Sequence, residues 1–224
     1  KVFTSVIELP QLSSRELSSA IKWVAEQYIP LPLDQVNVDY TVLREAKDTG
    51  TNKMEVLLVA APKVLVDRYL TIAELADLTT VGAETEIIAT SRAVGRSIPN
   101  VKTVMVVSLG AQTTDIAVLK NGVLAFTRSV GSGGEAITRA IAQNLDFTVT
   151  QAEEYKRTYG LAKDKLEGMI MNAATPIMDT IVAEMKRSIA FFEEKYKEQH
   201  VETILLSGGT ARLPGMVVYL AEAL

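Results

Sequence analysis

Two apolar runs separated by a short glycine-bearing loop constrain the fold of this chain most. They occupy residues 104–107 and 116–119, and the dipeptide Asn121-Gly122 follows them. Because Asn and Gly tolerate the positive φ angles of a type I′ turn, this dipeptide predicts a hairpin into a third strand over residues 123–128. Glycine in the loop 110–114 lets backbone amides face an anion while threonine hydroxyls donate beside them, although most such loops are plain turns. The stretch predicts antiparallel strands and a candidate phosphate loop.

Two later glycine turns point to the same chemistry. Gly133-Gly134-Glu135 precedes an amphipathic helix over residues 136–145, so its amides are predicted to form a helix N-terminus, where anions are favoured. Gly208-Gly209-Thr210 follows a short apolar strand at 203–206, and Pro214 is predicted to open a last helix. Glycines in these turns let the backbone approach a flat ligand closely. Three such turns at the ends of strands or helices are more than loops alone lead one to expect.

Residues 1 to about 61 predict a compact α/β module. Strands are predicted at 2–9, 36–42 and 54–61, with a helix between the first two. Ser13 and Glu16 have the spacing of a capping box, in which each side chain accepts from a free amide of the other residue. The apolar residues that recur every three or four positions in this helix, and are predicted to be buried, are Leu17, Ile21, Ala25 and Tyr28.

Proline and threonine positions predict further helix boundaries. Pro62 is placed as the first-turn proline of a helix that runs to about residue 78. Thr150 is predicted to cap a helix over residues 151–159, and Pro176 to kink or break a long helix over 165–199. The residues of the Pro62 helix that are predicted to point inward are Leu65, Tyr69, Ile72 and Leu75.

Composition excludes several classes of protein. The 224 residues are 48% hydrophobic and 22% charged, with a net charge of −4 and no cysteine. The negative charge argues against nucleic acid as a main partner. Without cysteine there is no disulfide framework and no thiolate metal site. No apolar run reaches the roughly 18 residues of a spanning helix. The chain lacks an initiator Met and a signal peptide, so we expect it to begin inside a longer protein.

Four motifs in combination carry a family resemblance. They are LGAQTTD at 109–115, GGE at 133–135, AEEYK at 152–156 and LSGGTARLP at 206–214. Together they resemble the nucleotide cleft of the actin-like ATPase superfamily, and within it the PilM family of type IV pilus assembly, with FtsA-type cell-division proteins as the nearest relatives. The early segments LPQLSSREL at 9–17, AEQYIP at 25–30 and VDY at 38–40 resemble PilM more specifically.

The resemblance implies an α/β, actin-like (ribonuclease H-like) fold with a small inserted α/β subdomain. Residues 1–80 correspond to that subdomain, 81–100 to a remnant of the first actin-like lobe and 101–224 to the second lobe. The N-terminal part of the first lobe, with its first phosphate loop, is expected to be missing because the chain starts after it.

The resemblance also implies a site for ATP or ADP with Mg²⁺. Asp115 matches an acid that orders metal-bound waters, and Glu86 loosely matches a water-orienting acid, so these two are the catalytic candidates. Taken alone, Asp115 is equally well a strand-end carboxylate that caps a turn, and Glu153 with Lys156 an ordinary surface ion pair. The residues that match nucleotide-binding positions are Gly110, Ala111, Gln112, Thr113, Gly133, Gly134, Glu135, Glu153, Lys156, Gly208, Gly209, Thr210 and Arg212.

One departure weakens the expectation of hydrolysis. Ser108 stands where hydrolytic relatives carry an acid at the head of the second phosphate loop, and a neutral hydroxyl organises hydrated Mg²⁺ poorly. The resemblance therefore implies ATP binding with weak or absent ATPase activity. The catalytic metal is expected to contact Asp115 only through water.

The implied role is that of a cytoplasmic scaffold at the inner face of the inner membrane. It would dock the cytoplasmic N-terminal peptide of a PilN-like membrane protein and couple to pilus motor or platform proteins; a homo-oligomer is also expected to be possible. An extended peptide held by strand edges is a familiar docking mode. Two alternatives stay open, an active ATPase or small-molecule kinase and an FtsA-like polymer at the membrane.

Overall fold

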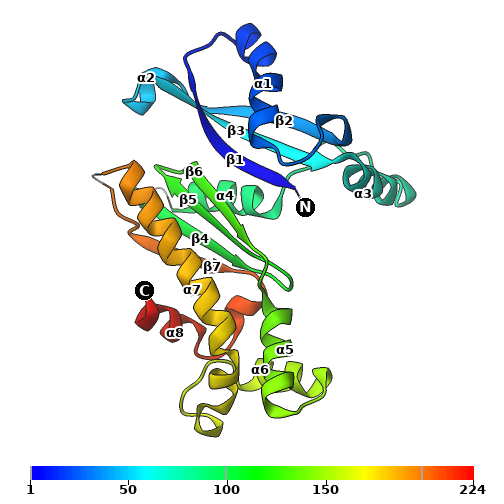
Figure 1. Ribbon diagram of the computed structural model, residues 1–224, viewed down its shortest axis with the longest axis vertical. Coiled ribbons are helices and arrows are strands. Elements are labelled where there is room, and N and C mark those ends of the chain that lie inside the picture. Colours follow the sequence, from blue (N-terminus) through cyan, green and yellow to red (C-terminus); the bar gives the residue numbers. More distant parts are fainter. Residues whose placement is uncertain (1, 99, 198) are drawn as a thin grey trace. The chain divides into compact units, whose positions relative to one another are not determined.

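The computed structural model describes residues 2–98, 100–197 and 199–224, and it contains two β-sheets. The three-stranded sheet has the order β1-β3-β2, from β1 (Phe3–Pro10), β2 (Val36–Arg44) and β3 (Lys53–Pro62). The four-stranded sheet has the order β6-β5-β4-β7, from β4 (Thr103–Leu109), β5 (Thr114–Lys120), β6 (Val123–Val130) and β7 (Thr203–Ser207). Figure 1 shows both sheets with the helices that accompany them.

Contacts divide the chain into two compact units. One consists of Lys1–Ala89 with Val123–Thr127, and the other of Thr90–Gly122 with Arg128–Leu224. The assignment of residues 1–80, 81–100 and 101–224 to parts of an actin-like protein stays a prediction. Within the described ranges, no helix has both the length and the apolar character needed to cross a bilayer.

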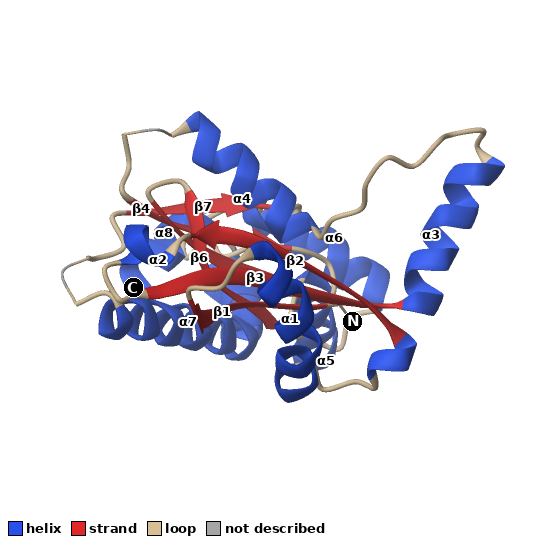
Figure 2. Cartoon of the chain, turned by 90° about the horizontal axis from the view of Figure 1, so that it is seen from above, coloured by secondary structure: helices blue, strands red, loops and turns tan. Residues whose placement is uncertain are grey.

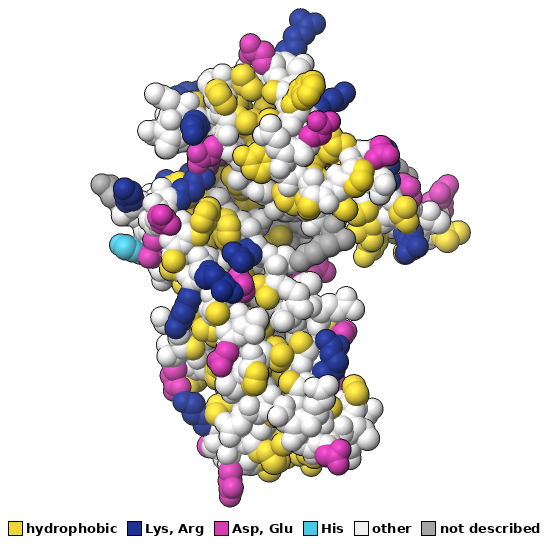
Figure 3. All heavy atoms as spheres, viewed as in Figure 1, with side chains coloured by type: hydrophobic (Ala, Val, Ile, Leu, Met, Phe, Trp, Pro, Cys, Tyr) yellow, Lys and Arg dark blue, Asp and Glu magenta, His cyan; other side chains and the backbone are white. Residues whose placement is uncertain are grey.

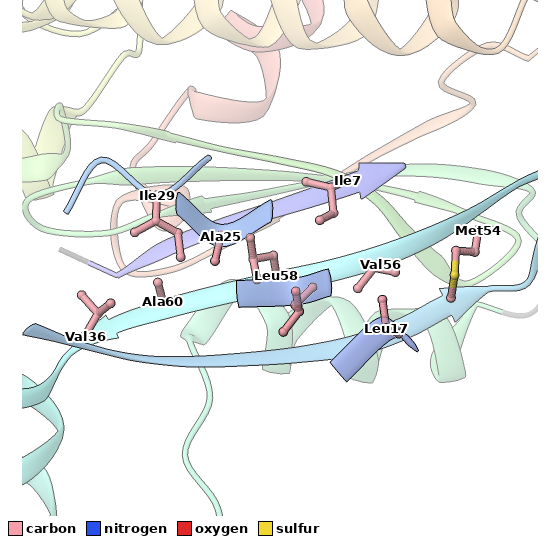
Figure 4. Packing of buried hydrophobic residues seen from close by; sticks show 10 residues of the cluster. Ile7, Leu17, Ala25, Ile29, Val36, Met54, Val56, Leu58 and Ala60 are labelled. Atoms are coloured by element: carbon pink, nitrogen blue, oxygen red, sulfur yellow. The ribbon is translucent and has the colours of Figure 1, made fainter. Parts of the chain in front are cut away.

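The first unit is built on α1 (Ser14–Tyr28), which packs against one face of the three-stranded sheet. The Ser13–Glu16 capping box is confirmed, and it satisfies amides at the helix start. Leu17, Ile21 and Ala25 are buried as predicted, and Figure 4 shows Leu17 and Ala25 among the apolar side chains of the sheet. Tyr28, the last residue of the helix, is exposed instead, and the residue after it, Ile29, is buried.

Short elements complete this unit. They are η1 (Leu33–Gln35), α2 (Ala46–Thr49), α3 (Lys63–Leu75) and the start of α4 (Glu86–Ser97). Pro62 was predicted as the first helical residue of α3, but it occupies the N-cap position and the helix starts one residue later, at Lys63.

The apolar side chains of α3 lie at the surface, contrary to the prediction that they point inward. Tyr69, Ile72 and Leu75 are exposed, Leu75 by 83%, and none of the α3 residues is buried. Figure 2 shows α3 beyond the end of β3 and followed by a long loop, and Figure 3 shows apolar atoms at the surface in this region. The helical period was right, but burial also needs a second surface against which to pack.

Strands β4, β5 and β7 of the four-stranded sheet belong to the second unit, whereas Val123–Thr127 of β6 are grouped with the first. Strand β4 pairs antiparallel with β5 and parallel with β7, so that Ser108 lies opposite Asp115 on one side and Ser207 on the other. Asn121 and Gly122 have φ angles of 51° and 76°, as the predicted type I′ turn requires. Residues 104–107 and 116–118 are fully buried, which explains the apolar runs.

Helices flank this sheet and supply two corrections. They are α5 (Gly134–Leu145), α6 (Val149–Tyr159), η2 (Leu166–Gly168), α7 (Met169–Lys195), η3 (Thr210–Arg212) and α8 (Met216–Ala223). Helix α6 starts earlier than predicted and its cap is Thr148, which forms a capping box with Gln151, not Thr150. Helix α7 contains Pro176 in its first half and continues through it, packing on β5 and α5 (Figure 1).

Candidate functional site

The three glycine turns of the second unit meet at the carbonyl oxygen of Gly110. The amide of Gly134 donates to this oxygen over 2.9 Å, and the hydroxyl of Thr210 donates to it over 3.2 Å. The amide of Glu135 reaches the next carbonyl, that of Ala111, over 2.8 Å. Turns separated by up to a hundred residues in sequence are therefore joined by direct hydrogen bonds. They lie together at the ends of β4 and β7.

Two of the glycines are required by this close approach. A Cβ at Gly133 would lie 2.7 Å from the carbonyl oxygens of both Gly110 and Ala111. At Gly208 the φ angle is +89°, and a Cβ would lie 2.4 Å from the carbonyl oxygen of Leu109. Distances below 3.0 Å from a Cβ to backbone atoms are not tolerated, so larger residues would force the turns apart.

The hydrogen bonds decide which amides can face an anion. Those of Gly134 and Glu135, at the N-terminus of α5, are taken by carbonyl groups of the 110–111 loop, and that of Gly110 donates to Thr113 over 2.9 Å. Among the described residues, the amides of Ala111, Gln112 and Thr113 have no acceptor. Ala111 and Gln112 are also exposed. An anion would meet this loop, not the helix N-terminus.

Lys156 lies in the middle of this arrangement and is only 5% exposed. Its ammonium group donates to the carbonyl of Gly134 over 3.0 Å, to the hydroxyl of Thr138 over 2.8 Å and to Glu153 Oε2 over 2.6 Å. Burial raises the pKa of Glu153, but hydrogen bonds from Lys156 and Thr138 lower it more, so the carboxylate titrates below its ordinary range. The pair is thus not an ordinary surface ion pair.

A row of polar side chains crosses the sheet beneath the loop. Ser108, Asp115 and Ser207 are register partners on three neighbouring strands, so their side chains share one face. Asp115 Oδ2 accepts from the hydroxyl of Thr113 over 3.0 Å. Ser207 Oγ is buried and has no partner within the described structure.

This row fits a hydrated cation better than a directly bound one. Nowhere in the described ranges do three or more His, Cys, Asp or Glu side chains gather closely enough to hold a metal ion. One carboxylate and two hydroxyls can accept hydrogen bonds from the water shell that Mg²⁺ retains, while the inner positions would be filled by phosphate oxygens. The donor set is consistent with Asp115 acting through water.

The remaining candidates have simpler surroundings. Glu135 is exposed and pairs with Arg139 at 3.7 Å, and Arg212 is exposed at the end of η3. The guanidinium of Arg212 has no partner among the described side chains, so it is available to a ligand. Glu86 is exposed at the first residue of α4 and belongs to the first unit, and its suggested role stays a prediction.

Sequence reasoning missed two residues that hold the turns. Thr138 links Gly134, Lys156 and Glu153, and buried Thr114 donates to the carbonyl of Ser132 over 2.8 Å. The only signal for Thr138 was its position one helical turn after Gly134, where a hydroxyl reaches the preceding carbonyl. Nothing local indicated the contact between Thr114 and Ser132.

Comparison with protein families gives a match over residues 1–224 to the model described as type IV pilus assembly protein PilM. The chain belongs to the PilM family. The resemblance read from the motifs is thereby confirmed. Among curated proteins, the ethanolamine utilization protein EutJ of Escherichia coli strain K12 is 28% identical over 111 residues, which cover 50% of this chain and 35% of that protein.

Solved structures confirm the actin-like fold. The chain is similar to a protein in the PilM-PilN type IV pilus biogenesis complex, with a TM-score of 0.83 and 25% identity over 99% of this chain and 63% of that one. It also resembles MreB5 of Spiroplasma citri bound to ADP, with a TM-score of 0.51 and 18% identity over 72% of this chain and 58% of the other. This PilM family chain thus spans less than two thirds of the length of each of these relatives.

Proposed function

We propose that this PilM family chain belongs to a nucleotide-binding, actin-like scaffold of type IV pilus assembly, which docks the cytoplasmic tail of a PilN-like membrane-anchored protein. The observation that carries the nucleotide part is the convergence of three glycine turns on the Gly110 carbonyl. Such convergence leaves the loop 111–113 with free amides and places Asp115 directly behind it. Free amides in a glycine-bearing loop are suited to phosphate oxygens.

The nucleoside end would lie between α6 and η3. Glu153 has a side chain that is 44% exposed and only its Oε2 is engaged, so Oε1 is available to accept from a ribose hydroxyl. Arg212 offers a planar guanidinium that can stack on a base. MreB5 of Spiroplasma citri, a protein of similar fold, has been solved with ADP bound, which supports the nucleotide part of the proposal.

The partner part of the proposal is supported by the family and by the likeness to a protein solved in a PilM-PilN complex. In the first unit, β1 and β2 are the two edges of a three-stranded sheet. Edge strands present unpaired backbone groups to which an extended peptide can add. Membrane association would then come through the partner.

A binding experiment tests the nucleotide site. Calorimetric titration with ATP and with ADP, each with Mg²⁺, should show saturable binding to the wild-type chain. Gly133→Ala should weaken it about tenfold or more, because a Cβ there would force the 110–111 carbonyls away. Gly131→Ala is the matched control, since a Cβ at Gly131 meets nothing within 4 Å. Absence of binding to the wild-type chain would refute the nucleotide part.

Peptide binding tests the partner part separately. The fluorescence anisotropy of a labelled cytoplasmic N-terminal peptide of a PilN-like protein should rise when the chain is added. The anisotropy of a scrambled peptide should not. Equal binding of both peptides would exclude specific docking.

Steady phosphate release from ATP should be slow, because Ser108 provides no carboxylate at the head of the loop.

A further inference from the structure

Lys156 contributes all three protons of its ammonium group to contacts inside the protein. One goes to the carbonyl of Gly134, one to the hydroxyl of Thr138 and one to Glu153 Oε2, at 3.0, 2.8 and 2.6 Å. A lysine has three donors and no acceptor. Its donor capacity is therefore used up before any nucleotide arrives.

The Gly134 carbonyl connects this buried charge to the loop. While the carbonyl of Gly134 accepts from Lys156, its amide donates to the Gly110 carbonyl over 2.9 Å. The Gly134 position is so crowded that a Cβ would lie 2.6 Å from Thr210 Oγ1 and 3.4 Å from Lys156 Nζ. The ammonium of Lys156, the Gly134 peptide and the Gly110 carbonyl thus form one continuous chain of contacts, with Thr210 closing it from the other side.

Burying the ammonium group of Lys156 costs free energy, which argues that this residue organises the turns around it. A buried ammonium is unfavourable unless it is paired and fully hydrogen-bonded, and even then an apolar residue of similar size is often as stable. An ordinary i,i+3 pair on a helix surface stabilises by only a few tenths of a kcal/mol and leaves the lysine in water. Here the lysine crosses from α6 to the start of α5.

We propose, building on the nucleotide site proposed above, that Lys156 is a positioning residue that locks the Gly133–Gly134 turn onto the 110–113 loop. Glu153, with its free oxygen, is left as the member of the pair that can face a ribose. The function of the charge is to hold a peptide carbonyl, so that the loop amides stay in place for phosphate.

Hydrogen exchange tests the lock without any ligand. In the full chain, Lys156→Met should raise the exchange rates of the Gly134 and Glu135 amides by about tenfold, because loss of a buried charged hydrogen bond releases the turn they hold. Lys163→Met removes the same charge from an exposed pair with Glu222 and should leave these amides unchanged. Thr138→Val removes one partner of the ammonium and also the bond of Thr138 itself to the Gly134 carbonyl, so it should raise the same rates and serves as the positive control for a loosened turn. Unchanged exchange in Lys156→Met would overturn the proposal.

Two ligands test whether the lock supports phosphate binding. Affinities for Mg²⁺-ATP and for Mg²⁺-tripolyphosphate should both fall in Lys156→Met, because the loop that faces phosphate has lost its support. Lys156 also holds Glu153 at the nucleoside end, so the decisive ligand is tripolyphosphate, and an unchanged affinity for it would overturn the proposal. If the wild-type chain binds neither ligand, the proposed function fails, while the exchange rates still decide whether Lys156 locks the turn.

Discussion

Gly208 and Gly209 are neighbours with opposite structural requirements. Gly208 has a φ of +89° and no room for a Cβ, whereas Gly209 has a φ of −64° and open space. We expect Gly208→Ala to lower the free energy of unfolding by about 1–3 kcal/mol or more. Gly209→Ala should be neutral or stabilising by up to about 1 kcal/mol, because it restricts the unfolded chain. Urea denaturation of both variants measures the contrast, and equal effects would contradict the assigned backbone geometry.

The carboxylate of Glu153 should make stability depend on pH. Its folded pKa lies below the unfolded value, despite the opposing effect of burial, because Lys156 and Thr138 donate to it. Its contribution is therefore complete above the unfolded pKa and is lost as pH falls through the folded pKa. Glu153→Gln should be less stable than wild type at pH 7, and the difference in unfolding free energy should shrink as pH falls below the ordinary pKa of a glutamate. Glu154→Gln, on the exposed face of α6, serves as the control for chemical denaturation.

At the level of single residues, sequence gave the positions of the required glycines but not the environment of the charges. A glycine next to a strand end is visible in the sequence, and its purpose follows from the backbone it permits. The burial of Lys156 depends on α5 crossing near α6, two helices whose packing no local pattern specifies. The same holds for Thr138, whose three partners come from both helices.

The start of α6 provides a test at the level of the secondary-structure element. Thr148 accepts from the amide of Gln151, and the side chain of Gln151 accepts from the amide of Thr148. Thr148→Ala should therefore cost about 1 kcal/mol of unfolding free energy. Thr150→Ala, at the position that the sequence had favoured, should change it by less than about 0.5 kcal/mol. Thermal denaturation of the two variants decides which residue is the N-cap of α6. A larger loss of stability in Thr150→Ala would show that Thr150 is the cap.

Elements with strong local signals were predicted well, and elements whose burial depends on a distant surface were not. The capping box of α1 and the Asn121-Gly122 hairpin depend on neighbours within four residues, so the sequence contains the whole interaction. Helix α3 has the correct period of apolar residues, yet Tyr69 and Ile72 are exposed. Periodicity identifies which face of a helix is apolar, while packing decides whether anything covers it.

At the scale of the whole molecule, nucleotide binding should appear as added stability. A ligand that binds only the folded chain raises the unfolding free energy by about 2.7 kcal/mol at a free concentration of about 100 Kd. Differential scanning fluorimetry with Mg²⁺-ATP should therefore raise the Tm of the wild type, whereas Mg²⁺ alone should not. Gly133→Ala should show a much smaller rise at the same ATP concentration, since its turn cannot close. An equal rise in both proteins would place the bound ATP elsewhere.

The sequence by itself determined the strands, the hairpin, the glycine turns and, through four motifs, the family. These depend on backbone preferences and on short patterns that each segment carries alone. Only the tertiary structure decided that the Gly134 amide and the Thr210 hydroxyl share the Gly110 carbonyl, that the α5 amides are already occupied, and that Lys156 is buried. The reason is that a hydrogen-bond donor has many possible acceptors along a chain, and packing selects one by bringing distant segments within 3 Å of each other.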